Sequence, residues 1–146
     1  MNGILETTCA AAVLGLMLMV TVVPARGKEI PYPEKCRANA MAMPGQIKGE
    51  AAKGPEMSSE MTDYQKSFGL GMREMNTNMM AGMMQNDADV AFVCGMIAHH
   101  IGAISMAETE LAHGDNEAAK SMAQKIIDAQ KAEIESMKAW LEKGEK

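Results

Sequence analysis

The chain of 146 residues has few of the side chains on which most enzymes and metal cages depend. It contains two Phe, two Tyr, one Trp, three His and three Cys, so a cage of four cysteines or four histidines is excluded within one chain. No glycine-rich phosphate loop and no Ser-centred nucleophile elbow occurs. Positive charge is also scarce, with 14 Lys and Arg against 19 Asp and Glu. Because no local Lys/Arg cluster offers a cationic surface, nucleic acid is not expected as a partner.

Methionine is the residue in excess, at 17 of the 146 residues. The length suits one globular domain with a sizeable core. Flexible methionines fill irregular cores, but their thioethers also bind soft cations. Methionine and histidine are therefore the expected donors of any metal site.

The first 25 residues have the organisation of a secretory leader. The apolar run from Cys9 to Val23 is short for a membrane span, which needs about 20 apolar residues. Val23 and Ala25 suit the positions before a signal-peptidase cut, which predicts cleavage after Ala25 and a periplasmic protein without membrane contact. The leader has no Lys or Arg before its apolar run and contains Glu6, so an uncleaved anchor is the alternative.

Residues 26–60 are rich in proline and glycine and show no sustained period, which predicts a flexible, disordered arm. Met41, Met43 and Met57 lie in this arm, either as incidental linker residues or as additional metal donors. Residues 61–146 are expected to form a helical metal-binding domain.

Apolar periodicity and capping residues predict three helices, near residues 62–85, 88–112 and 117–143. Thr62 begins a capping-box pattern, Asp87 caps the second helix, and Gly114 ends it at C′. Asp115 or Asn116 caps the third helix. The expected fold is all-α: an antiparallel bundle of three long helices, ferritin-like, that follows the disordered arm.

The first helix carries an apolar stripe within one arc about 100° wide, and this stripe is its expected buried face. Three glycines weaken this helix by up to about 1 kcal/mol each relative to alanine, so it should depend on packing. The stripe consists of Met61, Tyr64, Phe68, Met72, Met75, Met79 and Met83, and the glycines are Gly69, Gly71 and Gly82.

The second helix brings two imidazoles and two thioethers onto one face. With Met96 at 0°, His99 falls at about 300°, His100 at about 40° and Met106 at about 280°. A single Met or His is usually structural, but adjacent histidines flanked by two methionines favour a metal site. On the third helix, Gln130 or Glu133 is expected to accept the spare N–H of His99 or His100 and so fix its tautomer. Direct ligation by Glu133 is the alternative.

Donor softness predicts the metal. Thioethers favour Cu(I), and by the same softness Ag(I), whereas hard cations need oxygen-rich cages. Zinc is the second choice, because it would leave the methionine surplus unexplained. Cys94 falls at about 160° on the same wheel, opposite the His–Met face. It is either a buried inert thiol or, in an oxidising compartment, the disulfide partner of Cys36.

The stretch from Phe92 to Ala107 contains the motif Met-x-x-His-His-x-Gly-Ala-x-x-Met, and a second characteristic stretch runs from Ala123 to Leu141. Together they resemble the CopM-like family of periplasmic, copper-binding, ferritin-like helical proteins, over about residues 62–143. Family members often carry Pro in place of Ala98 and Gln in place of Ile101. The resemblance implies a copper metallochaperone or sequestration protein. It also implies the metal donors Met96, His99, His100, Met106 and Met137.

The expected function is therefore an exported Cu(I)- or Ag(I)-binding protein in metal sequestration, tolerance or delivery, without catalytic residues. Its expected partners are copper ions and other periplasmic copper-handling proteins, and a homodimer is left open. A di-iron enzyme would need two Glu-x-x-His motifs, and only the pair Glu110 and His113 is present. The alternative function is a methionine-rich helical protein-interaction module without metal.

Overall fold

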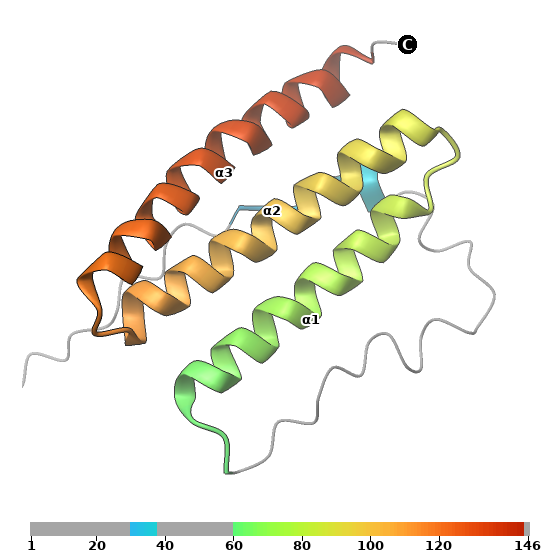
Figure 1. Ribbon diagram of the computed structural model, residues 1–146. Coiled ribbons are helices and arrows are strands. Elements are labelled where there is room, and N and C mark those ends of the chain that lie inside the picture. Colours follow the sequence, from blue (N-terminus) through green and yellow to red (C-terminus); the bar gives the residue numbers. More distant parts are fainter. Residues whose placement is uncertain (1–29, 38–59, 145–146) are drawn as a thin grey trace, which may run out of the picture.

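The computed structural model describes residues 30–37 and 60–144 of the chain (Figure 1). A short 3₁₀ helix, η1 (Glu34–Arg37), precedes three long helices, α1 (Asp63–Met83), α2 (Ala88–His113) and α3 (Glu117–Lys143). No strand occurs in the described ranges. The all-α prediction is confirmed, and the predicted helix boundaries agree within two residues. The predicted leader and the methionines Met41, Met43 and Met57 lie outside the described residues.

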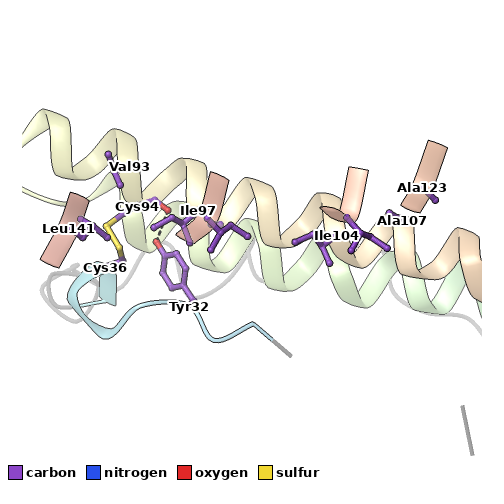
Figure 2. Packing of buried hydrophobic residues seen from close by; sticks show 12 residues of the cluster. Tyr32, Cys36, Val93, Cys94, Ile97, Ile104, Ala107, Ala123 and Leu141 are labelled. Atoms are coloured by element: carbon purple, nitrogen blue, oxygen red, sulfur yellow. Dashed lines mark hydrogen bonds between the residues drawn. A yellow bond between two sulfur atoms is a disulfide. The ribbon is translucent and has the colours of Figure 1, made fainter. Parts of the chain in front are cut away.

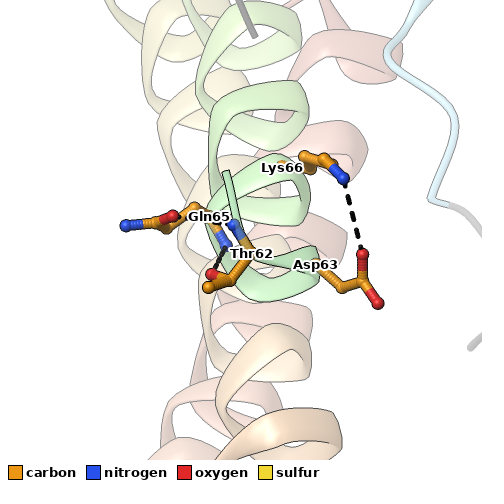
Figure 3. Close-up of polar contacts among 4 residues, drawn as sticks. All are labelled: Thr62, Asp63, Gln65 and Lys66. Carbon is orange, nitrogen blue, oxygen red and sulfur yellow. Dashed lines mark hydrogen bonds and ion pairs between the residues drawn. The ribbon is translucent and has the colours of Figure 1, made fainter. Parts of the chain in front are cut away.

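Side-chain caps begin each of the three long helices. At α1, the backbone N–H of Gln65 donates to the Thr62 hydroxyl at 3.4 Å, and the N–H of Thr62 donates to the Gln65 side chain at 2.8 Å (Figure 3). Asp87 caps α2 and Asn116 caps α3. Gly114 ends α2 in an extended conformation, with φ −71° and ψ 157°, rather than in the left-handed region typical of a C′ glycine. These local signals fix where the helices begin.

The three helices lie side by side in a single layer, with α2 in the middle (Figure 1). Both α1 and α3 pack along α2 rather than on each other. By length and composition alone, α2 is apolar enough to cross a bilayer, and half of that apolar window is buried inside the fold. This central position explains why α2 is the most apolar helix, since it has neighbours on two sides.

Glycine allows α1 to approach α2 closely. A Cβ atom at Gly82 would lie 2.8 Å from the carbonyl carbon of Cys94 and 2.9 Å from the nitrogen of Gly95. A Cβ at Gly102 would overlap the side chain of Met75. The helices therefore meet along a line of small residues, at a spacing that larger side chains would prevent.

This close approach shifts the buried face of α1 to one edge of the predicted stripe. The most buried residues of the helix are Asn78 and Gly82, not the methionine stripe. Tyr64, Met72 and Met83 are 44–50% exposed, whereas Met61, Phe68, Met75 and Met79 are half-buried. Met75 and Met83 of the stripe lie beside Gly102 and Gly95 of α2. The closest contact is nevertheless at one edge of the stripe, because Gly82, which was predicted only to weaken the helix, lets the backbones approach there.

The seam between α2 and α3 forms most of the apolar core. Ile97 of α2 and Ile134 of α3 are fully buried there. Further along the seam, Ile104 and Ala107 of α2 are buried together with Ala123 and Ile127 of α3 (Figure 2). Leu141, near the end of α3, extends this core towards the N-terminal segment (Figure 2).

Residues 30–37, which lie inside the predicted flexible arm, are ordered and tied to one face of the layer. Cys36 forms a disulfide with Cys94, with Cα atoms 5.4 Å apart (Figure 2). The hydroxyl of Tyr32 donates to the carbonyl of Cys94 at 3.1 Å, and the side chain of Gln85 donates to the carbonyl of Cys36 at 2.9 Å. Lys35 also donates to the carbonyl of Leu141 at 2.7 Å. Cys94 is therefore a disulfide partner and not the inert thiol of the first alternative.

Candidate metal site

His100 lies in the seam between α2 and α3, and its side chain is only 8% exposed. Its Nε2 atom is 2.5 Å from Oε2 of Glu133 on α3. The predicted contact between the histidine pair and a polar residue of the third helix is thereby confirmed, with His100 and Glu133 as the partners. Because a carboxylate only accepts hydrogen bonds, the N–H at Nε2 is the donor.

The other ring nitrogen of His100, Nδ1, is buried and has no hydrogen-bond partner among the described residues. A neutral imidazole that carries its hydrogen on Nε2 has its lone pair on Nδ1. Burial of an unpaired polar atom costs free energy, on the order of 1–3 kcal/mol. Histidines that bind metals commonly donate their other N–H to a carboxylate, which orients the ring and raises its basicity. His100 has this arrangement, and the lone pair on its Nδ1 atom is available to bind a metal ion.

The antiparallel register of α2 and α3 places two thioethers at one level beside His100. Because His100 lies opposite Glu133, Met96 one turn earlier on α2 is level with Met137 one turn later on α3. Both methionines are half-buried, and Met137 packs against the core. The predicted donors Met96, His100 and Met137 therefore lie within one turn of the same level along α2 and α3, with one nitrogen and two sulfur atoms.

The other two predicted donors lie at the surface. His99 is exposed, and its ring centroid is 5.9 Å from that of His100. Met106 is 45% exposed. It lies seven positions after His99, which is about 10 Å along a helix. Within one chain, the structure does not bring His99 and Met106 into the stretch of seam that holds His100.

Donor chemistry restricts what this site can bind. The described part of the chain contains no group of three or more His, Cys, Asp or Glu side chains that could hold a metal ion. A set of one imidazole and two thioethers is instead suited to a soft monovalent cation. A cavity of about 580 Å³ lies elsewhere, between residues 31–35 and the C-terminal part of α3, and none of the predicted donors lines it.

All of the residues in this site were predicted from the sequence, but the ordered N-terminal segment was not. Tyr32 is buried there between two prolines. The sequence feature that could have indicated an ordered segment is this aromatic residue four positions before Cys36, in a chain with few aromatics. Burial raises the pKa of Tyr32 from 10.0 to about 12, although the charge of Arg37 acts in the opposite direction.

No curated protein is matched by the chain. The family model described as "Domain of unknown function (DUF305)" matches residues 24–141, which include η1 and nearly all of the three-helix layer. Because this match covers most of the chain, the protein belongs to the DUF305 family.

Proposed function

We propose that this protein is an exported Cu(I)- and Ag(I)-binding protein that acts in metal sequestration, tolerance or delivery. The observation that carries the proposal is the hydrogen bonding of the two ring nitrogens of His100. Glu133 holds its Nε2 atom, and its buried Nδ1 has no partner among the described residues. A lone pair kept free in an apolar seam, level with two thioethers, favours a soft cation over a structural role.

Each residue of the site has a distinct role in this proposal. Nδ1 of His100 and the sulfur atoms of Met96 and Met137 bind the cargo, and Glu133 orients the imidazole. His99 and Met106 are additional donors at the surface of α2. The site binds without catalysing a reaction, and exchange of thioether ligands suits transfer to another copper-handling protein.

Further observations support a copper protein that is exported to an oxidising compartment. The resemblance to the CopM-like family suggests a periplasmic copper protein, and the leader-like first 25 residues suggest export. The Cys36–Cys94 disulfide supports an oxidising compartment, because disulfides seldom persist in the cytosol.

The test is a Cu(I) titration of the purified chain against a competing chelator, in ascorbate so that the disulfide is retained. We expect tight Cu(I) binding, with Ag(I) as a competitor and with Mg²⁺, Ca²⁺ and Mn²⁺ retained far more weakly. The variant with both His99→Ala and His100→Ala should lose affinity. His113→Ala, which removes the exposed third histidine at the end of α2, is the matched control. Equal or stronger retention of a hard cation contradicts the proposal.

A second candidate function is a methionine-rich protein-interaction module that uses no metal. The exposure of Met72, Met83, Met106 and Met122, each 45–59%, favours it. Flexible methionines adapt to many apolar partners. Absence of Cu(I) binding in the same titration would leave this function as the better explanation.

A further inference from the structure

α2 has three stripes of residues at heptad spacing, and the fold uses two of them. Gly95, Gly102 and Ser105 belong to the stripe that meets α1. Ile97, His100 and Ile104 belong to the stripe that packs towards α3. The third stripe, called the open seam below, has the spacing of a coiled-coil interface. It consists of Phe92, Met96, His99, Ala103, Met106 and Glu110.

The open seam lies on the face of the layer opposite the N-terminal segment. On α1, Met72 and Met83 lie about 80–100° around the helix from Gly82, where a Cβ would meet the Tyr32 hydroxyl of the N-terminal segment. On α3, Met122 and Ile126 lie about 120–160° around the helix from Lys138 and Glu142. These last two residues line the cavity beside the N-terminal segment.

This open face, formed by the open seam with its neighbours on α1 and α3, exposes much apolar surface. Six large apolar side chains on it are 44–67% exposed. At about half of the 150–250 Å² of a large side chain, they present roughly 600 Å². Soluble monomers seldom leave larger apolar patches, and a stable interface buries about 800 Å² per partner. The six are Met72, Met83, Phe92, Met106, Met122 and Ile126.

We propose that the open face is the interface of a homodimer, in which the open seams of two copies pack antiparallel about a twofold axis. The exposed area is close to what a stable dimer needs. A helical domain normally has two packed layers, whereas the described residues of this chain form one layer with a short segment on its back. A second copy supplies a layer of the same length.

The open seam is also complementary to itself. When it is reversed about its midpoint, Met96 of one copy meets Met106 of the other, His99 meets Ala103, and Phe92 meets Glu110. Such a self-matching patch is what a twofold interface requires. Glu110, at one end of the seam, is its only acidic residue, and Ala103 near the middle permits close approach of the two helices.

Sedimentation of the purified chain over a range of concentrations tests the dimer, without added metal. We expect the wild type to sediment as a dimer and Met106→Glu to raise the dimer dissociation constant at least about 100-fold, because an unpaired charge would be buried. Leu70→Glu is the matched control. Leu70 is 48% exposed, similar to Met106, but lies about 160° around α1 from Met72. Its dissociation constant should stay within about threefold of wild type.

A monomeric wild type at every concentration overturns the proposal, and so does a Met106→Glu variant that dimerises as tightly as wild type. Because Met106 is exposed, helical circular dichroism should be unchanged in this variant. Both results are independent of copper binding, which is measured separately.

Cross-linking tests the antiparallel arrangement. A Met96→Cys chain mixed with a Met106→Cys chain should form mixed disulfides under mild oxidation in preference to homotypic ones. A Met96→Cys chain mixed with Leu70→Cys should not. Predominantly homotypic cross-links, or equal yields with Leu70→Cys, overturn the antiparallel seam.

Discussion

His100 and Glu133 join the middle of α2 to the middle of α3, with Nε2 and Oε2 2.5 Å apart, and only the histidine is buried. The carboxylate is on the solvent side, at 59% side-chain exposure, so it orients the ring from outside the seam. Glu133→Gln keeps the size of the side chain but removes its charge. We expect Cu(I) affinity to fall about 10-fold, within the range for loss of a carboxylate that supports a ligating histidine.

Glu135→Gln is the control for this prediction, because Glu135 is exposed on the same helix and pairs only with Lys138 in the described structure. It should leave Cu(I) affinity unchanged. If Glu133→Gln and Glu135→Gln bind Cu(I) equally well, Glu133 does not position the ligand.

Gly82 and Gly95 lie at the same crossing of α1 and α2, but they should respond oppositely to alanine. At Gly82 a Cβ meets backbone atoms of α2 at 2.8 and 2.9 Å, so Gly82→Ala should destabilise the fold by about 1–3 kcal/mol. At Gly95 the nearest neighbour is Cγ of Met83, at an ordinary 3.6 Å. Gly95→Ala should therefore stabilise by up to about 1 kcal/mol through helix propensity. Urea unfolding measures both, and destabilisation of similar size at both glycines would contradict this account.

The sequence was sufficient to predict the helices because their signals are local. Thr62, Asp87 and Asn116 cap the helices through contacts within three residues. The side of α1 that packs was only partly predictable in this way. Helical periodicity identifies an apolar stripe, but close contact at Gly82 depends on backbone atoms of another helix. On the wheel Gly82 lies about 20° from Met75, so the closest contact falls at one edge of the stripe and not at its centre.

The sequence was sufficient to predict which residues belong to the candidate site, but not which of them the fold brings together. A wheel places Met96, His99, His100 and Met106 on one side of α2, yet it contains no information about register with α3. The register separates His100, which reaches Glu133, from His99, which is exposed. The disulfide of Cys36 was left open for the same reason, since 58 residues separate it from Cys94.

The Cys36–Cys94 disulfide closes this long loop and should contribute about 4 kcal/mol to the free energy of unfolding. Reduction with dithiothreitol should lower the urea midpoint accordingly. In a chain with both Cys36→Ser and Cys94→Ser, the reductant should have no effect. An unchanged midpoint in the reduced wild type would show that contacts such as Tyr32 to Cys94 hold the segment without the disulfide.

Tyr32 should make stability depend on alkaline pH. Burial raises its pKa from 10.0 in the unfolded chain to about 12 in the folded one, so the folded state retains the phenol proton more strongly. The associated stabilisation is present below about pH 10 and is lost as the pH rises towards about 12. Over that interval, wild type should lose more stability than Tyr32→Phe in urea unfolding. Parallel curves for wild type and Tyr32→Phe would contradict the prediction, and exposed Tyr64→Phe should follow wild type.

The two adjacent histidines should differ in their effect on metal binding. His100 is buried with Nδ1 unpaired and Nε2 held by Glu133, whereas His99 is exposed and has no hydrogen bond to orient it in the described structure. His100→Ala should therefore lower Cu(I) affinity about 100-fold or more, and His99→Ala by less than about 10-fold.

Imidazole coordinates metal only when it is deprotonated, whereas thioethers do not titrate in water. Cu(I) binding by wild type should accordingly weaken as the pH falls, and His100→Ala should flatten that dependence more than His99→Ala does. Competition titrations at several pH values measure both effects. Equal losses for the two variants would place the site on the exposed side of α2, and an unchanged His100→Ala would reduce His100 to a structural role.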